Sequence, residues 1–119
     1  MKLTTAVFGL VLLMICLPAF SADHAGKKVY DQSCKNCHGP DGAGSNVADK
    51  FFGVAIPRLN SKSVQMKTDS EMEEIVLRGS GRMEPVRIGR PTLPHGKTKQ
   101  LTEQQIDDVV AYVRTFWKQ

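Results

Sequence analysis

The clearest hydrophobic pattern lies at the C-terminal end of the 119-residue chain. Thr102 and Gln105 have the spacing of a capping box, which pairs the first backbone N–H groups of a helix with side chains. Apolar residues then recur every three or four positions and form one stripe, made of Ile106, Val109, Val110, Val113 and Trp117. This spacing predicts an amphipathic helix that buries the stripe.

Two earlier segments are also predicted to be helical. Thr68 and Glu71 form a second capping box, and Gly79 offers a left-handed stop for that helix. A first helix is predicted for residues 25–36 and runs into a pair of cysteines. Residues 39–67 contain turn residues throughout, and nothing alternates long enough to predict a strand. The chain is therefore expected to be mostly helical with long loops.

The N-terminus has the pattern of a secretory signal. Lys2 is followed by an apolar run over residues 6–20, which Pro18 and small residues end. The run is shorter than the roughly 20 apolar residues that a transmembrane helix needs. We therefore predict a signal peptide in residues 1–22, cleaved after residue 21 or 22. The remaining domain, residues 23–119, is expected to be exported to the periplasm.

Composition limits what this domain is. Cleavage leaves 97 residues, enough for one domain with a modest core, so a further stabilising element is expected. The domain has 15 Lys and Arg against 12 Asp and Glu, a net charge of +3 that is too weak to indicate nucleic acid binding. Cys16 leaves with the signal, and Cys34 and Cys37 remain. A disulfide between them would close a very short loop and stabilise little.

The segment "CKNCH" gives these cysteines another use. Cys34 and Cys37, followed directly by His38, have the pattern of covalent c-type haem attachment. Two thiols one helical turn apart can add to two vinyl groups of one porphyrin, and the next imidazole then binds iron. A thioredoxin-like motif would need a βαβ pattern, and a zinc ribbon would need a second ligand pair. No βαβ pattern is visible in the sequence. The remaining histidines, His24 and His95, do not have the spacing of a second zinc-ligand pair.

From these motifs, the domain resembles a class I monohaem cytochrome c from end to end. The first helix with Gly26 and Tyr30, "CKNCH", "IPRL", a methionine loop and the terminal "VVAYV" follow the order of that family. The resemblance implies an all-α cytochrome c fold, with three to five helices and long loops wrapped around one covalently bound haem c. It also implies that the first and last helices cross, with Gly26 and Tyr30 against Val109 and Tyr112.

The resemblance also implies roles around the haem. Pro57 of "IPRL" is expected to accept a hydrogen bond from the His38 imidazole through its carbonyl, which would orient the ring. Leu59 is expected to line the haem pocket. Three glycines are expected to let the backbone turn close to the ring: Gly39, Gly42 and Gly44.

The second axial ligand decides between an electron carrier and a reactive haem. Met83 is the expected ligand, since it follows a helix stop and lies where the family carries its methionine. His95 is the main alternative. Met72 falls on the apolar face of the middle helix, and Met66 lies close to the start of that helix. The proline that often follows the family's methionine directly stands one residue later here, at Pro85.

A basic segment surrounds the expected methionine. The 17 residues of the loop 84–100 are longer and more basic than expected, and the nearby cations are Arg78, Arg82, Arg87, Arg90, Lys97 and Lys99. Such a run is either a solvated face or a surface that steers an acidic redox partner. Arg58 is similarly either a partner of a haem propionate or a solvent-exposed cation.

The predicted function is one-electron transfer in the periplasm by a monomer with His38 and Met83 as axial ligands, and not enzymatic catalysis. A thioether ligand raises the reduction potential relative to two imidazoles. The expected partners are redox proteins, with no nucleic acid and no membrane span after cleavage. Two alternatives stay open: a haem enzyme or ligand sensor in which Met83 dissociates, and an electron-transfer subunit of a larger oxidoreductase.

Overall fold

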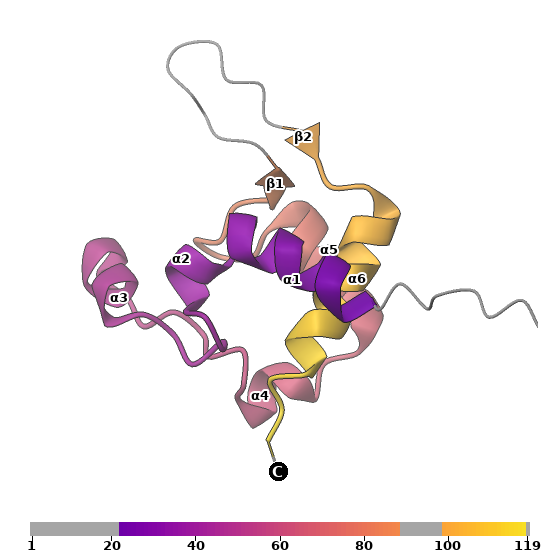
Figure 1. The fold of residues 1–119 in the computed structure, drawn as a ribbon. Helices are drawn as coiled ribbons and strands as arrows, with labels where there is room; N and C mark the ends of the chain where they lie inside the picture. Colours follow the sequence, from indigo (N-terminus) through magenta and orange to yellow (C-terminus); the bar gives the residue numbers. More distant parts are fainter. Residues whose placement is uncertain (1–21, 89–98, 119) are drawn as a thin grey trace, which may run out of the picture.

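A computed structural model describes residues 22–88 and 99–118 (Figure 1). The elements are α1 (Ala22–Ser33), α2 (Lys35–His38), α3 (Asn46–Phe52), α4 (Lys62–Gln65), α5 (Asp69–Arg78), β1 (Arg87–Ile88), β2 (Lys99–Gln100) and α6 (Glu103–Arg114). β1 and β2 pair antiparallel, with Arg87 opposite Gln100 and Ile88 opposite Lys99. None of the helices in these two ranges is long and apolar enough to cross a membrane. The predicted signal peptide, apart from residue 22, and His95 lie outside the described residues.

Both predicted capping boxes are present and start the helices as expected. The Thr102 side chain accepts from the N–H of Gln105, and the Gln105 side chain accepts from the N–H of Thr102, at the start of α6. Thr68 and Glu71 do the same at the start of α5. That helix ends at Gly79, whose φ of 79° lies in the left-handed region. Local side-chain chemistry therefore fixes where these helices begin and where α5 ends.

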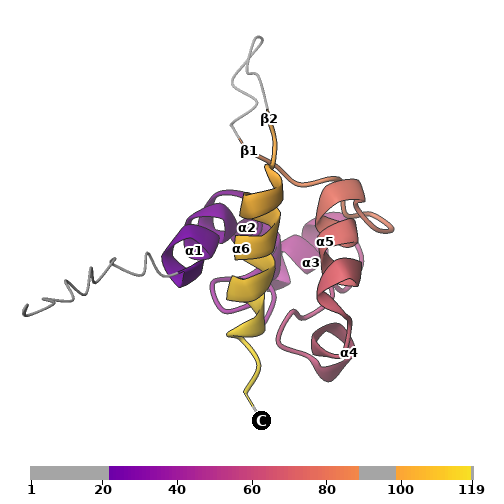
Figure 2. The same ribbon diagram turned by 90° about the vertical axis from the view of Figure 1, so that its right-hand side faces the viewer.

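The crossing of α1 and α6 forms the core (Figure 2). A Cβ on Gly26 would lie 2.0 Å from the carbonyl oxygen of Asp108 and 2.7 Å from the Cβ of Tyr112, so only glycine allows this approach. Tyr30 is fully buried, and its ring centroid lies 5.5 Å from that of Tyr112 and 5.0 Å from that of Phe116. These geometries favour edge-on aromatic contacts. The predicted contact between the first and last helices is confirmed.

Two details differ from the sequence-based expectation. The last buried aromatic of the C-terminal segment is Phe116, which is 8% exposed, whereas Trp117 is only half-buried. The chain leaves α-helical geometry after Arg114, so the helical period no longer decides which side chain turns inward. Residues 39–67, predicted as loop, contain the short helices α3 and α4. Each buries at most one side chain, so neither produces an apolar stripe in the sequence.

The remaining helices pack around the α1–α6 crossing. α5 packs against α6, and Met72 of α5 joins the buried cluster. α2 continues from α1, and α3 packs on α2. Figure 1 shows α3 at the edge of the molecule, away from α6. The segment that carries the cysteines and the histidine therefore lies between the helical core and α3.

Candidate haem site

The attachment motif is held as one turn at the junction of α1 and α2. The N–H of Cys34 donates to the carbonyl of Tyr30 at 2.9 Å, and the N–H of His38 donates to the carbonyl of Cys34 at 3.0 Å. Cys34 and Cys37 therefore lie about one helical turn apart, and His38, directly after Cys37, ends α2. Both cysteines are half-buried and neither forms a disulfide. This arrangement leaves two thiols beside one imidazole.

His38 is oriented by a backbone carbonyl. Its side chain is 8% exposed, and its Nδ1 lies 3.3 Å from the carbonyl oxygen of Pro57. This contact assigns the ring proton to Nδ1, because a carbonyl only accepts, and it leaves the lone pair on Nε2. Burial lowers the pKa of His38, the bond to Pro57 raises it, and the nearby Arg58 charge lowers it further. The net lowering favours neutral imidazole, which is the form that binds iron.

The cysteines lack the environment of a redox-active pair. Burial, and to a smaller extent Cys37, raises the pKa of the Cys34 thiol to about 12. Thiol–disulfide exchange needs the thiolate, and a raised pKa disfavours the thiolate at neutral pH. The described residues also contain no group of three or more His, Cys, Asp and Glu side chains that could hold a metal ion. These observations disfavour the thioredoxin-like and zinc interpretations of the motif.

The loop after His38 is folded tightly against other parts of the chain. Gly42 and Gly44 have φ values of 73° and 96°, which L side chains rarely adopt. A Cβ on Gly42 would lie 2.7 Å from the ring of Phe116, and one on Gly44 would lie 1.5 Å from Nη1 of Arg58. Side chains of the protein, Phe116 and Arg58, therefore already require glycine at these two positions.

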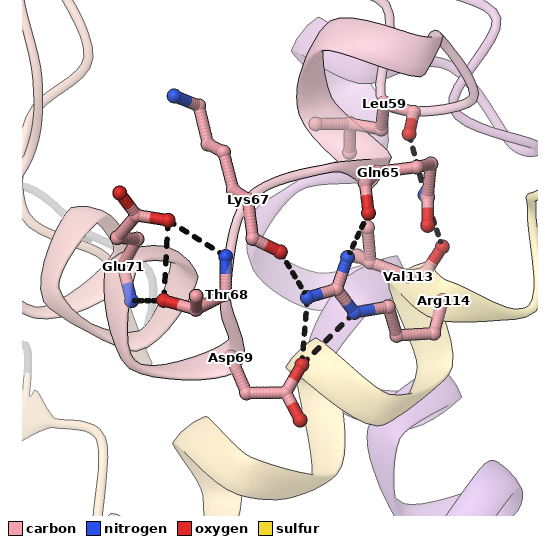
Figure 3. Close-up of polar contacts among 8 residues, drawn as sticks. All are labelled: Leu59, Gln65, Lys67, Thr68, Asp69, Glu71, Val113 and Arg114. Carbon is pink, nitrogen blue, oxygen red and sulfur yellow. Dashed lines mark hydrogen bonds and ion pairs between the residues drawn. The ribbon is translucent and has the colours of Figure 1, made fainter.

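Leu59 is held in place by contacts from three directions. Its N–H donates to the carbonyl of Gly42 at 2.8 Å, and its side chain packs against the buried cluster. Its carbonyl accepts a hydrogen bond of 2.7 Å from Nε2 of Gln65, which also donates to the carbonyl of Val113 in α6 at 3.0 Å (Figure 3). Gln65 thus links the segment next to Pro57 to the C-terminal helix. No sequence motif pointed to Gln65, since its partners lie 6 and 48 residues away.

Arg114 makes a second link of the same kind. Its Nη1 donates to the carbonyl of Gln65 at 2.7 Å, and its Nη2 donates to the carbonyl of Lys67 at 2.6 Å. Its Nε and Nη2 also donate to one carboxylate oxygen of Asp69, at 2.9 and 2.7 Å (Figure 3). No sequence motif pointed to Arg114 either. In the structure it joins the last turn of α6 to the start of α5.

Met83 lies in a short turn that folds back on α5. Ser80 and Met83 exchange two backbone hydrogen bonds of 2.9 Å, and the N–H of Val86 donates to the carbonyl of Val76 at 2.9 Å. Gly79 allows this reversal, because a Cβ there would lie 2.2 Å from the carbonyl oxygen of Met83. Met83 is half-buried and packs against the buried cluster.

The other sulfur candidates differ in exposure. Met72 is 7% exposed and belongs to the core, whereas Met66 is 72% exposed at the end of α4. Neither is placed like Met83, which is half-buried in a turn outside the regular helices. His95, the remaining alternative, cannot be compared in this way because it lies outside the described ranges.

Arg58 carries the one orphaned polar atom of the site. Its Nη2 forms an ion pair of 2.6 Å with Asp49, which also accepts a 2.8 Å hydrogen bond from the N–H of Ile56. Nη1 of Arg58 is buried and has no hydrogen-bond partner within the described part of the chain. A buried cationic N–H without a partner is costly and fits an anionic group such as a propionate. Two thiols, an imidazole lone pair and this cation together fit haem c.

Comparisons with known proteins agree with this fit. The family model for cytochrome c matches residues 24–117. Cytochrome c-555 of Methylococcus capsulatus is 32% identical over 93% of this chain and 80% of its own length, and cytochrome c-554(547) of Halothiobacillus neapolitanus is 29% identical over 76% and 92%. The solved structure of the KustC0563 c-type cytochrome aligns with a TM-score of 0.57 and 25% identity, over 78% of this chain and 98% of that one. With the attachment turn and the oriented imidazole in the same chain, these matches place the protein in the cytochrome c family.

Proposed function

We propose that this protein is an exported one-electron carrier of the periplasm in which His38 and Met83 are the two axial ligands of the haem iron. Family membership establishes haem c as its cofactor and electron transfer with redox partners as its general role. The observation that carries the finer proposal is the contact between His38 Nδ1 and the carbonyl of Pro57. It holds the ring and leaves the lone pair on Nε2, which supports His38 as one fixed ligand.

The residues of the chain have separate tasks in this function. Haem c, when bound, supplies an iron that changes by one electron between Fe(III) and Fe(II). Cys34 and Cys37 would hold the ring covalently, and His38 would bind the iron from one side. Met83 would bind from the other side through its thioether, which favours Fe(II) and raises the reduction potential. With both positions taken by side chains, the protein transfers electrons without binding a substrate at the metal.

The position of Met83 supports it as the second ligand. Its turn is fixed by Gly79 and by the paired hydrogen bonds to Ser80, and its side chain is neither fully buried nor fully exposed. Met72 is committed to the core, and Met66 is exposed directly after α4. A preorganised turn lowers the entropic cost of holding a ligand in one geometry.

Substitution of the two candidate ligands tests this assignment. Met83→Ala is expected to abolish the weak far-red absorption band of an iron–thioether bond in the oxidised holoprotein and to let carbon monoxide bind the reduced form. His95→Ala and the exposed control Met66→Ala are expected to leave the band unchanged. A band that is absent from the unsubstituted protein, or that is lost in Met66→Ala, would overturn Met83 as the ligand. Carbon monoxide binding to the unsubstituted reduced protein would favour a haem enzyme or sensor.

Export is the second part of the proposal. The predicted signal covers residues 1–22, and α1 begins at Ala22, next to the predicted cleavage sites. Expression in a bacterium that matures c-type cytochromes should yield a periplasmic product that starts at residue 22 or 23. Its mass should exceed that of the cleaved polypeptide by one haem. A cytoplasmic product that keeps residues 1–21 would contradict this part.

Charge steering by the basic residues around Met83 is the third part. Arg78, Arg82, Arg87 and Lys99 are exposed, and Arg78 also forms an ion pair of 2.5 Å with Glu74. Arg90 and Lys97 lie outside the described residues. The rate of electron exchange with an acidic partner should fall as salt is added, because ions screen long-range attraction. A rate that does not depend on ionic strength would exclude steering.

A further inference from the structure

Large exposed apolar side chains gather on and next to α3. Of the five in the described residues, four lie within residues 47–54: Val47 (79% exposed), Phe51 (81%), Phe52 (37%) and Val54 (41%). The fifth, Met66, is separate from them on α4. Single exposed apolar residues are ordinary, but a cluster of this kind marks a surface that another molecule covers. We call these four residues the α3 patch.

The two most exposed residues of the patch, Val47 and Phe51, lie on a face of α3 that carries none of its anchoring contacts. Val47 and Phe51 are one helical turn apart and share a face. α3 is anchored by other positions: Ala48 is 7% exposed, and Asp49 binds Arg58 and the N–H of Ile56. The ring centroids of Phe51 and Phe52 lie 5.0 Å apart at 88°, so the two aromatics form one edge-on pair. The exposed face is thus held in place by contacts made on the opposite face.

The patch adjoins both halves of the haem site. α3 packs on α2, which contains Cys37 and His38 (Figure 1). At the other end of α3, Nη1 of Arg82 donates to the carbonyl of Phe52 at 3.0 Å, and Arg82 directly precedes Met83. A molecule seated on α3 would therefore contact the protein between the attachment turn and the methionine turn. A redox partner seated there would lie beside both segments that are expected to hold the haem.

The charges around the patch indicate the chemistry of its occupant. Lys50 on α3, Lys35 on α2 and Arg82 are exposed cations. The carboxylate of α3, Asp49, is already paired with Arg58. A second copy of this chain would bring like charges together, which costs free energy at an interface. A partner surface with carboxylates around an apolar centre would complement both the apolar side chains of the patch and the cations around it.

We propose that the α3 patch is the docking surface for the protein that exchanges electrons with this one, and that it receives an apolar area bordered by carboxylates on that partner. The proposal rests on the electron-carrier function and adds where the partner binds. The cations would steer the encounter, and Val47 and Phe51 would hold the complex after contact. A small apolar contact suits a short-lived complex, which a shuttle between donor and acceptor needs.

The test uses the holoprotein and a defined probe. Reduced flavodoxin, an acidic flavoprotein, serves as donor, and the second-order rate of haem reduction is measured by stopped-flow absorbance. The double variant Val47→Ser/Phe51→Ser is expected to react about tenfold more slowly, because each lost apolar contact weakens the encounter complex. Met66→Ser, which alters an equally exposed apolar side chain on α4, is expected to react at the unsubstituted rate. An unchanged rate in the double variant, or an equal loss in Met66→Ser, would overturn the proposal.

A second reagent separates docking from the redox site. Dithionite, a small reductant that needs no docking surface, should reduce the double variant at the unsubstituted rate and with an unchanged reduction potential. Failure of the unsubstituted protein to cycle between oxidised and reduced states would refute the electron-carrier function itself. Lys50→Glu should slow only the flavodoxin reaction and weaken its dependence on salt. A Lys50→Glu rate equal to that of the unsubstituted protein would remove the electrostatic part of the proposal.

Two other occupants give different results. Co-sedimentation with phosphatidylglycerol vesicles that is lost in the double variant would assign the patch to a membrane surface and overturn a protein partner. Concentration-dependent dimers in sedimentation velocity that are lost in the double variant would assign it to self-association. The proposal expects neither, and a monomer without vesicle binding supports it when the flavodoxin rate falls.

Discussion

The approach of α1 to α6 makes a sharp prediction for Gly26→Ala. In most helices this change is favourable, because alanine has the higher helix propensity by about 0.5–1 kcal/mol. Here the added methyl group would lie 2.0 Å from the carbonyl oxygen of Asp108 and 2.7 Å from the Cβ of Tyr112. Propensity and packing therefore predict opposite changes in stability.

The magnitudes decide between them. Non-bonded carbon contacts are optimal at about 3.5–4.0 Å, so α1 and α6 would have to separate by about 1 Å or more. The clashing atom belongs to the backbone, and no rotamer change can move it. We take about 3 kcal/mol, the upper end of the usual range for overpacking, as the cost. Against a gain of about 1 kcal/mol, Gly26→Ala should lower the free energy of unfolding by about 2 kcal/mol.

Guanidinium denaturation of the holoprotein, followed by far-ultraviolet circular dichroism, measures this difference. Lys28→Ala is the matched control, since Lys28 is an exposed position in the same helix and changes propensity alone. The control should stay within about 0.5 kcal/mol of the unsubstituted protein. An unfolding free energy for Gly26→Ala that equals or exceeds the control would refute the argument that the helix crossing requires glycine.

Three further changes test individual contacts. Tyr30→Phe should lower the free energy of unfolding by about 1–3 kcal/mol, because the buried hydroxyl donates a 2.6 Å hydrogen bond to the carbonyl of Gly39. Phenylalanine would leave this carbonyl without a partner. An unchanged denaturation midpoint would contradict this expectation. Arg114→Ala should cost about 1–2 kcal/mol through the loss of four hydrogen bonds, and Arg114→Lys should recover less than half of it. Full recovery by lysine would show that charge alone is sufficient. The hydrogen bond from the N–H of Ile56, together with Arg58, lowers the pKa of Asp49. The ionised Asp49 therefore stabilises the fold fully above the usual carboxylate pKa of about 4, and this stabilisation disappears as the pH falls through the lowered pKa. Asp49→Asn should flatten this part of the stability–pH curve, and an identical curve would exclude a role for Asp49.

Features encoded within a few neighbouring residues could be predicted from the sequence. The starts of α5 and α6 depend on side chains three residues apart, and both capping boxes formed as predicted. The attachment motif is equally local, because one helical turn places its two thiols and the imidazole together. The predicted apolar stripe of the last helix is buried from Ile106 to Val113, as far as regular helical geometry applies.

Features that depend on tertiary placement were not predictable in this way. The acceptors of Gln65 and the Asp49–Arg58 pair belong to segments whose relative positions are set by loops. α3 was missed because Ser45 and Gly53 bound a helix of only seven residues with one buried side chain. The exposure of Val47 and Phe51 could not be inferred either, because an apolar residue in a loop gives no indication of which side faces solvent.

The contacts of Asp49 with Ile56 and Arg58 have a consequence for how such proteins diverge. The Asp49 carboxylate binds both the N–H of Ile56 and the guanidinium of Arg58, so it closes the stretch from the middle of α3 to Arg58 into a turn. The side chain of Phe51, which is 81% exposed in this turn, takes no part in these bonds or in the contact between Pro57 and His38. With the α3 patch as the proposed docking surface, we expect descendants of this sequence to change their partner at Phe51 while they keep the contact that orients His38.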